Sequence, residues 1–360
     1  MENNTISIKQ TFTIFILLII APITRILPMY LAEYSKQASL ISVILSIIPI
    51  LLLIYMLHYI FKKNSYTSLI DFFENVFGKV ISKILLIIYG IWTFILASIH
   101  VRYFAESFVN TIFPYVYLEL IIGTLLGLIL LIARKKIEFF ARSSEVFFVM
   151  FLIIMVLLFL IRLPQIKIEN IYPITTNDTG AILKGVYPII SIMCYLVYMF
   201  FLGDKISNKE ELLREGKKTT AIITILLIIV ALSTIGVFGH NVTQKFSLAY
   251  FKALKSADIF PTFQGLESIL VSSWLISDFV GITAFIYILS KISKNIFRLN
   301  SSKTLITPIM FSLFIFSIFF AKNKFELDEF IEIISFKVNL ILCIGIPILA
   351  ILIGKILKKV

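Results

Sequence analysis

The sequence predicts an all-α polytopic membrane protein with about ten transmembrane helices. Of its 360 residues, 59% are hydrophobic and only 15% are charged, whereas about a quarter of the residues in a soluble domain are charged. The apolar residues gather into ten long stretches, and about 20 residues of helix cross the hydrocarbon core of a bilayer. Backbone groups cannot stay unpaired in lipid, so the stretches must be helices or a closed barrel. The continuous apolar run at 147–161 lacks the alternation of a barrel strand, which favours helices.

The ten predicted spans divide the chain into two sets of five. The first set is 12–31, 40–61, 84–104, 118–133 and 146–161, and the second is 189–202, 219–238, 269–289, 305–321 and 338–357. The longest loops have about 23 residues, too few for a soluble domain of about 50. We therefore expect one transmembrane domain over residues 1–360, with a first repeat at about 9–163 and a second at about 184–357.

The basic residues predict the orientation of the chain. Its formal net charge is +12, but these residues occupy short loops between spans rather than one patch, so we expect the lipid bilayer and no nucleic acid as a partner. With a cytoplasmic N-terminus, the inner loops hold about twice as many Lys and Arg residues as the outer loops, as the positive-inside rule requires. Both termini are thus predicted to be cytoplasmic.

The first predicted span is interrupted by "IIAPITRILPMY". Pro22 and Pro28 each remove a backbone donor and clash with the preceding turn. Arg25 lies between them, and a charge at that depth usually faces a cavity or a partner. The alternative is that Arg25 extends to the headgroups at the membrane surface.

The sixth predicted span has a comparable interruption. We expect Gly185 and Pro188 to open it, and Tyr187, Ser191 and Tyr195 to give it a polar face. Breaks in the first and sixth helices are typical of the inverted five-plus-five repeat of LeuT/APC-like transporters. In that fold, unwound backbone and half-helix dipoles hold a substrate near the midplane.

Two pairs of charged residues are candidates for gating or ion coupling. Arg102 and Glu106 are four residues apart in the third span, so they can form an ion pair. Glu267 and Asp278, in the eighth span, lie about 20° apart on a helix. Intramembrane acids commonly couple protons or cations, although capture by helix dipoles or backbone is an equal alternative. We expect His100, near the end of a span, to be interfacial.

A short helix is predicted in the loop 239–261, because Phe246, Tyr250 and Leu254 recur every four residues. It could either plug the mouth of the bundle or gate a ligand.

No enzyme chemistry, metal site or cofactor is predicted. Cys194 and Cys343 both fall inside predicted helices, so they suggest neither a disulfide framework nor a metal site. The chain has no P-loop, no H-E-x-x-H, no G-x-S-x-G and no paired C-x-x-C motif. We therefore expect that the protein is not an enzyme.

Four segments resemble the B subunit of spore germinant receptors, the spore permease branch of the amino acid–polyamine–organocation superfamily. They are "ILPMYLAEYSKQASLISVIL" (26–45), "YGIWTFILASIHVRYFAESFVNTIFP" (89–114), "RKKIEFFARSSEVFF" (134–148) and "FQGLESILVSSWLISDF" (263–279). The resemblance covers nearly the whole chain, and its specificity lies in the order and spacing of these segments. The family often has Arg where this chain has Gly265, and an acid near Tyr195, so the resemblance leaves the identity of the ligand open.

The resemblance implies a protein of the dormant spore's inner membrane that binds a nutrient germinant, typically an amino acid. It would act with a germinant receptor A subunit and a lipoprotein C subunit. In that case, the backbone at Thr24, Arg25, Ile26 and Leu27 would hold a ligand carboxylate or ammonium. Tyr187, Ser191 and Tyr195 would shape the pocket for its side chain. The competing hypothesis is an amino acid permease of the same fold, with Glu267 or Asp278 as its protonation or cation site.

Overall fold

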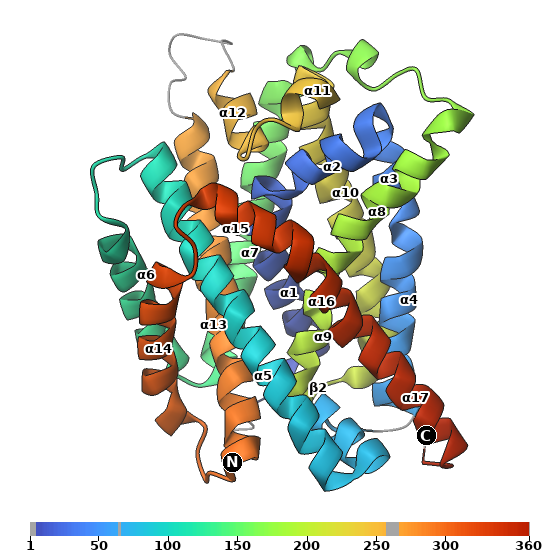
Figure 1. The fold of residues 1–360 in the computed structure, drawn as a ribbon, viewed down its shortest axis with the longest axis vertical. Helices are drawn as coiled ribbons and strands as arrows, with labels where there is room; N and C mark the ends of the chain where they lie inside the picture. The colour runs from blue at the N-terminus through green and yellow to red at the C-terminus, as the bar shows by residue number, and fades with distance from the viewer. Residues whose placement is uncertain (1–4, 64–65, 257–265, 360) are drawn as a thin grey trace.

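The computed structural model has the predicted all-α architecture over residues 5–63, 66–256 and 266–359, which it describes (Figure 1). In the first half, the α-helices are α1 (Ile8–Arg25), α2 (Leu27–Ser35), α3 (Ser39–Leu45), α4 (Ile47–His58), α5 (Leu69–Thr111), α6 (Leu118–Ala133) and α7 (Ile137–Arg162). The second half contains α8 (Thr179–Met193), α9 (Tyr195–Met199), α10 (Leu212–Phe238), α11 (His240–Thr243), α12 (Ala249–Lys255), α13 (Leu266–Phe297), α14 (Ile306–Phe319), α15 (Lys324–Phe330), α16 (Phe336–Leu340) and α17 (Ile346–Ile356).

Short helical segments of other types connect or extend these helices. The 3₁₀ helices are η1 (Lys36–Ala38), η3 (Leu163–Gln165), η4 (Ile168–Asn170), η5 (Thr176–Asp178), η6 (Phe200–Lys205), η7 (Lys209–Glu211) and η8 (Lys303–Leu305). The π-helical segments are η2 (Tyr59–Lys63), η9 (Ile331–Ser335) and η10 (Ile341–Gly345).

Ten helical segments correspond to the ten predicted spans. Within the described residues, eight are long and apolar enough to cross a membrane, and two shorter apolar helices, Leu118–Ala133 and Lys303–Phe319, coincide with the predicted fourth and ninth spans. The last span begins earlier than we predicted, at Lys324 instead of residue 338. Its first turns carry Lys324, Glu326 and Asp328, and these charges make the start of the helix unlike an apolar stretch.

Both ends of the chain lie at one end of the bundle, and α11 and α12 lie at the opposite end, here called the distal end (Figure 1). An even number of crossings places the two ends in this way. Close to the termini, the strands β1 (Ile6–Ser7) and β2 (Ile206–Ser207) pair in parallel, with Ile6 opposite Ile206. The pair joins the segment that precedes α1 to the segment that follows η6.

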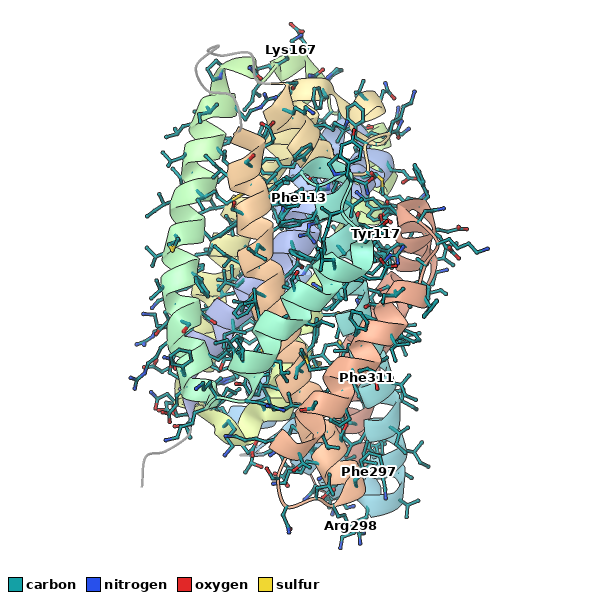
Figure 2. All side chains as sticks on the ribbon, turned by 90° about the vertical axis from the view of Figure 1, so that its left-hand side faces the viewer. Phe113, Tyr117, Lys167, Phe297, Arg298 and Phe311 are labelled. Carbon is teal, nitrogen blue, oxygen red and sulfur yellow. The ribbon has the colours of Figure 1, made fainter. Side chains whose placement is uncertain are left out.

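The outside of the bundle is apolar (Figure 2). Phe311 on α14 and Tyr117 before α6 are 66% and 81% exposed, and Lys167 and Arg298 lie near opposite ends of the molecule (Figure 2). Large exposed apolar surfaces are rare on soluble monomers, whereas a lipid-facing surface must be apolar. The protein is therefore an integral membrane protein with multiple transmembrane helices.

Helix α1 runs through the middle of the bundle and is almost entirely buried. It contacts α7, α10 and α13, and α13 in turn packs along α5. The serine Ser7 caps its first turn, because its hydroxyl accepts from the Gln10 backbone N–H at 3.1 Å and the Gln10 side chain accepts from the Ser7 N–H at 3.0 Å. A central helix of this kind positions its own break deep within the protein.

Gly185 lets α8 approach α2 and α3 closely. A Cβ atom at this position would lie 1.6 Å from Ser35 Oγ and 2.8 Å from Ser42 Oγ. Ser42 Oγ also donates to the Ile182 backbone carbonyl at 2.9 Å. Small residues at such contacts let membrane helices pack backbone to backbone, so Gly185 is a packing residue inside α8. Our prediction that it opens the sixth span is wrong.

We predict that Gly185→Ala lowers the stability of the protein by about 1–3 kcal/mol, the usual cost of overpacking. The thermal unfolding midpoint of the detergent-solubilised protein measures this effect. Gly180→Ala is the matched control, since Gly180 is in the same helix and a methyl group there would meet no atom within 4 Å. Equal midpoints for the two variants would contradict the packing role.

Candidate functional site

The first predicted break lies between α1 and α2, at Ile26. Pro22 has no N–H to donate to the preceding turn, and the Ile26 N–H donates to the Pro22 carbonyl at 3.1 Å. Pro28 occupies the first turn of α2, where a missing N–H is tolerated best. The helix therefore ends and restarts within one residue, as the two prolines predict.

A side chain of α13 is inserted beside this break. The Ser277 hydroxyl donates to the Leu17 carbonyl at 2.6 Å and accepts from the Ala21 N–H at 2.9 Å. Leu17 and Ala21 are the residues whose backbone groups would bond each other in a regular helix. A hydroxyl bridging these two groups ties α13 to α1 just before the break.

The second break separates α8 from α9 at Cys194. The Cys194 N–H still donates to the Ile190 carbonyl at 3.0 Å, and the chain continues as the short α9 and then as the 3₁₀ helix η6. We expected Pro188 to open this span, but it lies inside α8. The interruption itself is confirmed, while its position is six residues later than the proline.

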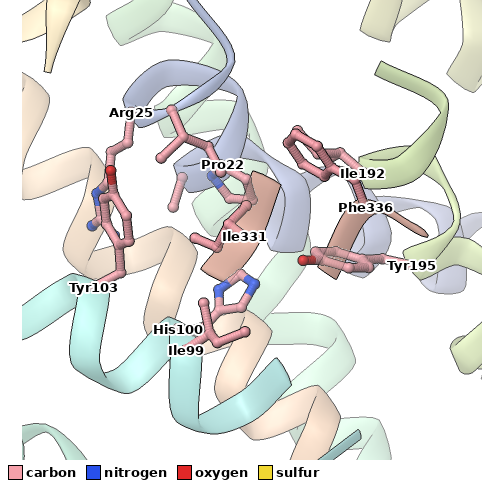
Figure 3. Close-up of a pocket in the computed structure, with 11 residues that line it drawn as sticks. Pro22, Arg25, Ile99, His100, Tyr103, Ile192, Tyr195, Ile331 and Phe336 are labelled. Atoms are coloured by element: carbon pink, nitrogen blue, oxygen red, sulfur yellow. The ribbon is translucent and has the colours of Figure 1, made fainter. Parts of the chain in front are cut away.

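A small cavity lies between the two breaks (Figure 3). Its volume is about 30 Å³, close to the volume of one water molecule in the liquid. The lining comes from both breaks, from α5, and from the helices of the last span: Ala21, Pro22, Arg25, Ile26, Ile99, His100, Tyr103, Ile192, Tyr195, Ile331 and Phe336. Arg25 and Tyr103 lie on one side of this cavity and Tyr195 on the other (Figure 3).

Arg25 is buried and paired, not extended to the membrane surface. Its side chain is 2% exposed, and its Nη2 forms an ion pair with Asp278 Oδ2 on α13. The second carboxylate oxygen of Asp278 is 3.4 Å from His100 Nδ1 on α5. A buried charge is costly unless a partner and hydrogen bonds compensate it. The three side chains thus join α1, α5 and α13 in one polar cluster.

Aromatic rings complete the surroundings of Arg25. Its guanidinium carbon is 4.7 Å from the Trp274 ring centroid and 5.9 Å from that of Tyr103, distances at which cation–π attraction operates. Trp274 Nε1 donates to Thr24 Oγ1 at 2.8 Å. The Nε atom of Arg25 has no hydrogen-bond partner among the described residues. Its N–H is therefore an unsatisfied donor of the guanidinium.

A second polar group lies beside the cavity, under α15. Tyr103 OH donates to Asp328 Oδ1 at 2.8 Å, and Tyr30 OH donates to the Asp328 backbone carbonyl at 2.8 Å. Lys324 is 8% exposed, and its Nζ is 5.1 Å from the Tyr103 ring centroid. Because Tyr103 also lines the cavity, this group connects the cavity to α2 and α15.

The predicted pair of Arg102 and Glu106 forms as expected. Arg102 Nη2 and Nε donate to Glu106 Oε1 at 2.7 and 3.1 Å, and Arg102 Nη1 donates to the Ile318 carbonyl at 2.7 Å. Both side chains are buried, but neither lines the cavity. Glu267 is partly exposed at the start of α13 and has no ion-pair partner among the described residues.

The structure brings together only part of the predicted ligand set. Arg25, Ile26 and Tyr195 line the cavity, and Asp278 pairs with Arg25. The other predicted ligand residues are engaged elsewhere or lie outside the lining: Thr24 bonds Trp274, Ser191 Oγ donates to the Phe336 carbonyl at 3.1 Å, Tyr187 packs against the Phe336 ring at 5.8 Å, and Leu27 is fully buried.

Several residues of the site were not predicted from the sequence. His100 is 5% exposed and lines the cavity, so our expectation of an interfacial position is wrong. The reason is that α5 continues to Thr111, which puts His100 well inside the helix. His100 and Tyr103 are three residues apart, and Lys324 and Asp328 are four apart. Such spacing places each pair on one face of a helix, and the sequence could have indicated both pairs in this way. No metal-binding group of three or more His, Cys, Asp or Glu side chains occurs within the described residues.

Comparisons with known proteins agree with this architecture. Over 330 residues, the chain is 22% identical to the putative spore germination protein YfkT of Bacillus subtilis (strain 168), covering 91% of this chain and 90% of that protein. It is 20% identical over 345 residues to spore germination protein KB of the same organism, covering 94% and 92%.

A solved structure of a Na+-coupled sialic acid symporter, in a substrate-bound outward-open state, has a similar fold. The TM-score is 0.66 at 12% sequence identity, over 94% of this chain and 79% of that one. Such a likeness supports the LeuT/APC-like fold with breaks in its first and sixth helices, and at this identity it carries no function.

The pattern of the family described as "Spore germination protein" matches residues 5–325. This match covers most of the chain, including both breaks and the Arg25–Asp278 pair. The protein therefore belongs to the spore germination protein family, the spore permease family that its sequence resembles.

Proposed function

We propose that this protein is the nutrient-sensing membrane subunit of a spore germinant receptor, and that it binds an amino acid between its two broken helices. The observation that carries the proposal is a cavity at both breaks that contains one guanidinium, in a chain of the spore germination protein family. Permeases, receptors and transporters share this architecture, and no step of covalent chemistry is needed for sensing.

The cavity has a suitable group for each part of an amino acid. Arg25, with its unpartnered Nε, suits a carboxylate, because charge-assisted bonds to guanidinium are strong and directional. The C-terminal ends of α1 and α8 lie at the breaks, and their partial negative charge suits an ammonium group. Ile99, Ile192 and Phe336 suit a small apolar side chain.

The cavity must widen when the ligand enters. Its volume of about 30 Å³ is far below the few hundred Å³ of a typical ligand pocket. A ligand carboxylate that binds the guanidinium of Arg25 competes with Asp278. This competition weakens the contact between α1 and α13. Ligand binding then shifts the population toward a wider arrangement of the bundle.

In this proposal, partner subunits respond to the change in the arrangement of the helix bundle. An A subunit and a lipoprotein C subunit, in the spore inner membrane, are the partners that the family resemblance implies. The termini, which share one end of the bundle (Figure 1), would face the cytoplasm, as the charge asymmetry of the loops predicts.

The second candidate is a proton- or cation-coupled amino acid permease, which the transporter fold favours. Coupling needs an acid that is free to take up a proton or a cation, and Asp278 is already neutralised by Arg25. Glu267 remains as the candidate for coupling. Fold alone does not separate the two functions.

Uptake by proteoliposomes separates sensor from carrier. We expect no accumulation of labelled amino acids driven by a sodium or proton gradient, because a sensor responds to ligand occupancy and does not carry the ligand across the membrane. Deletion of the gene should block germination triggered by the cognate nutrient. Robust gradient-driven uptake by the protein alone would instead establish the permease.

We predict that Tyr195→Ala and Arg25→Ala each raise the germinant concentration for half-maximal germination by about tenfold or more, equivalent to about 1.4 kcal/mol of binding. Both remove a side chain from the cavity lining. Tyr115→Ala is the control, since Tyr115 is 97% exposed. An unchanged dose–response in both cavity variants would remove the proposed site.

We predict that breaking the Arg25–Asp278 pair on one side only destabilises the protein by about 3–5 kcal/mol, because one buried charge loses its partner. Arg25→Met and Asp278→Leu should each lower the thermal unfolding midpoint of the purified protein. The double variant should recover most of this loss, since similar-sized apolar residues then face each other.

The same double variant separates stability from sensing. If Arg25 binds the ligand, spores that carry the double variant at normal abundance should still fail to respond to the germinant. A normal response would show that the ion pair is only structural.

A further inference from the structure

A third buried guanidinium, that of Arg162, lies at the distal end of the bundle. Arg162 is the last residue of α7 and is 0% exposed. Its Nε, Nη1 and Nη2 atoms all lack a hydrogen-bond partner among the described residues, in contrast to Arg25 and Arg102, which are paired with acids.

Two further buried donors lie beside it. Tyr250 on α12 and Ser233 on α10 are each 0% exposed, and neither hydroxyl has a partner among the described residues. Burial raises the pKa of the Tyr250 phenol, and this effect outweighs the nearby Ser233 hydroxyl and the positive charge of Arg162, which both lower it. The phenol therefore stays protonated and does not serve as a counter-ion for the guanidinium.

The guanidinium of Arg162 therefore has no hydrogen-bonded acceptor among the described residues. A guanidinium has five N–H donors and accepts nothing, and each hydroxyl adds one donor. An uncompensated charge in such a place is strongly destabilising. A cation would be repelled, and a neutral ligand would leave the charge uncompensated.

We propose that Arg162, Ser233 and Tyr250 form a binding site for a small monovalent anion of the halide or nitrate class. The side chains come from α7, α10 and α12, so the anion would join three elements of the distal end. Complete burial of all three favours a small ion over a lipid headgroup, whose chain must remain in the bilayer.

The site is linked to the helix that closes the distal end. Of the two options for the short helix, the structure supports the plug, because α12 buries Tyr250, Phe251 and Leu254 against the bundle. The ring of Phe251 lies 6.2 Å from that of Trp274, which in turn contacts Arg25. A bound anion would hold α12 in this closed position next to the residues that surround the cavity.

The test measures the thermal unfolding midpoint of the purified full-length protein while chloride replaces gluconate at constant ionic strength. We expect a saturable rise of about 3 °C or more, because a ligand that binds only the folded state stabilises it. Bromide and nitrate should act as chloride does. Arg162→Gln should abolish the dependence, whereas Arg134→Gln, on an exposed side chain that bonds Thr307, should preserve it.

Two milder variants cover the case in which Arg162→Gln fails to fold. Tyr250→Phe and Ser233→Ala each remove one hydroxyl, and we expect the half-saturating chloride concentration to rise about fivefold in each, the usual effect of one hydrogen bond. An unfolding midpoint independent of chloride in the unmodified protein would overturn the proposal. The same would follow if Tyr250→Phe and Ser233→Ala left the half-saturating concentration unchanged.

Discussion

The ion pair of Arg25 and Asp278 is the constraint around which the centre of this protein is organised. A guanidinium buried in a membrane protein must be neutralised by a partner, and the partner here comes from a helix 253 residues away in sequence. Because Asp278 is on α13 and also meets His100 on α5, the requirement to compensate one charge positions three helices. Two residues of the cavity lining, Arg25 and His100, are held in place by this single carboxylate.

The break in α1 and the ion pair depend on each other. Pro22 weakens the helix, and Ser277 bridges the backbone groups of Leu17 and Ala21. Ser277 and Asp278 are adjacent on α13. One turn of that helix therefore both interrupts the backbone hydrogen bonding of α1 and neutralises the charge of Arg25. A ligand that competes for Arg25 therefore acts at the place where α1 is least continuous, which is where a change in binding can most easily become a change in helix arrangement.

Charge compensation also differs between the surroundings of the cavity and the distal end of the bundle. Near the cavity, Arg25, Arg102, Asp328 and Lys324 have partners or aromatic contacts. At the distal end, by contrast, the guanidinium of Arg162 has no hydrogen-bond partner among the described residues. The ring of Phe251 lies 6.2 Å from that of Trp274, and Trp274 contacts Arg25, so packed side chains connect α12 to the lining of the cavity.

The sequence by itself determined the membrane class, the ten spans, the break in the first helix and the pairing of Arg102 with Glu106. All of these depend on local features, namely apolar length, proline and i, i+4 spacing, which act within one helix. It identified Arg25 and Asp278 as candidates, but not as partners of each other. Only the tertiary structure decided that pairing, the burial of His100, and the position of the second break at Cys194, because each depends on which helices lie side by side. Thr24 and Ser191 illustrate the same limit: both are on the right helices, and contacts with Trp274 and Phe336 turn their hydroxyls to neighbouring helices rather than to the cavity.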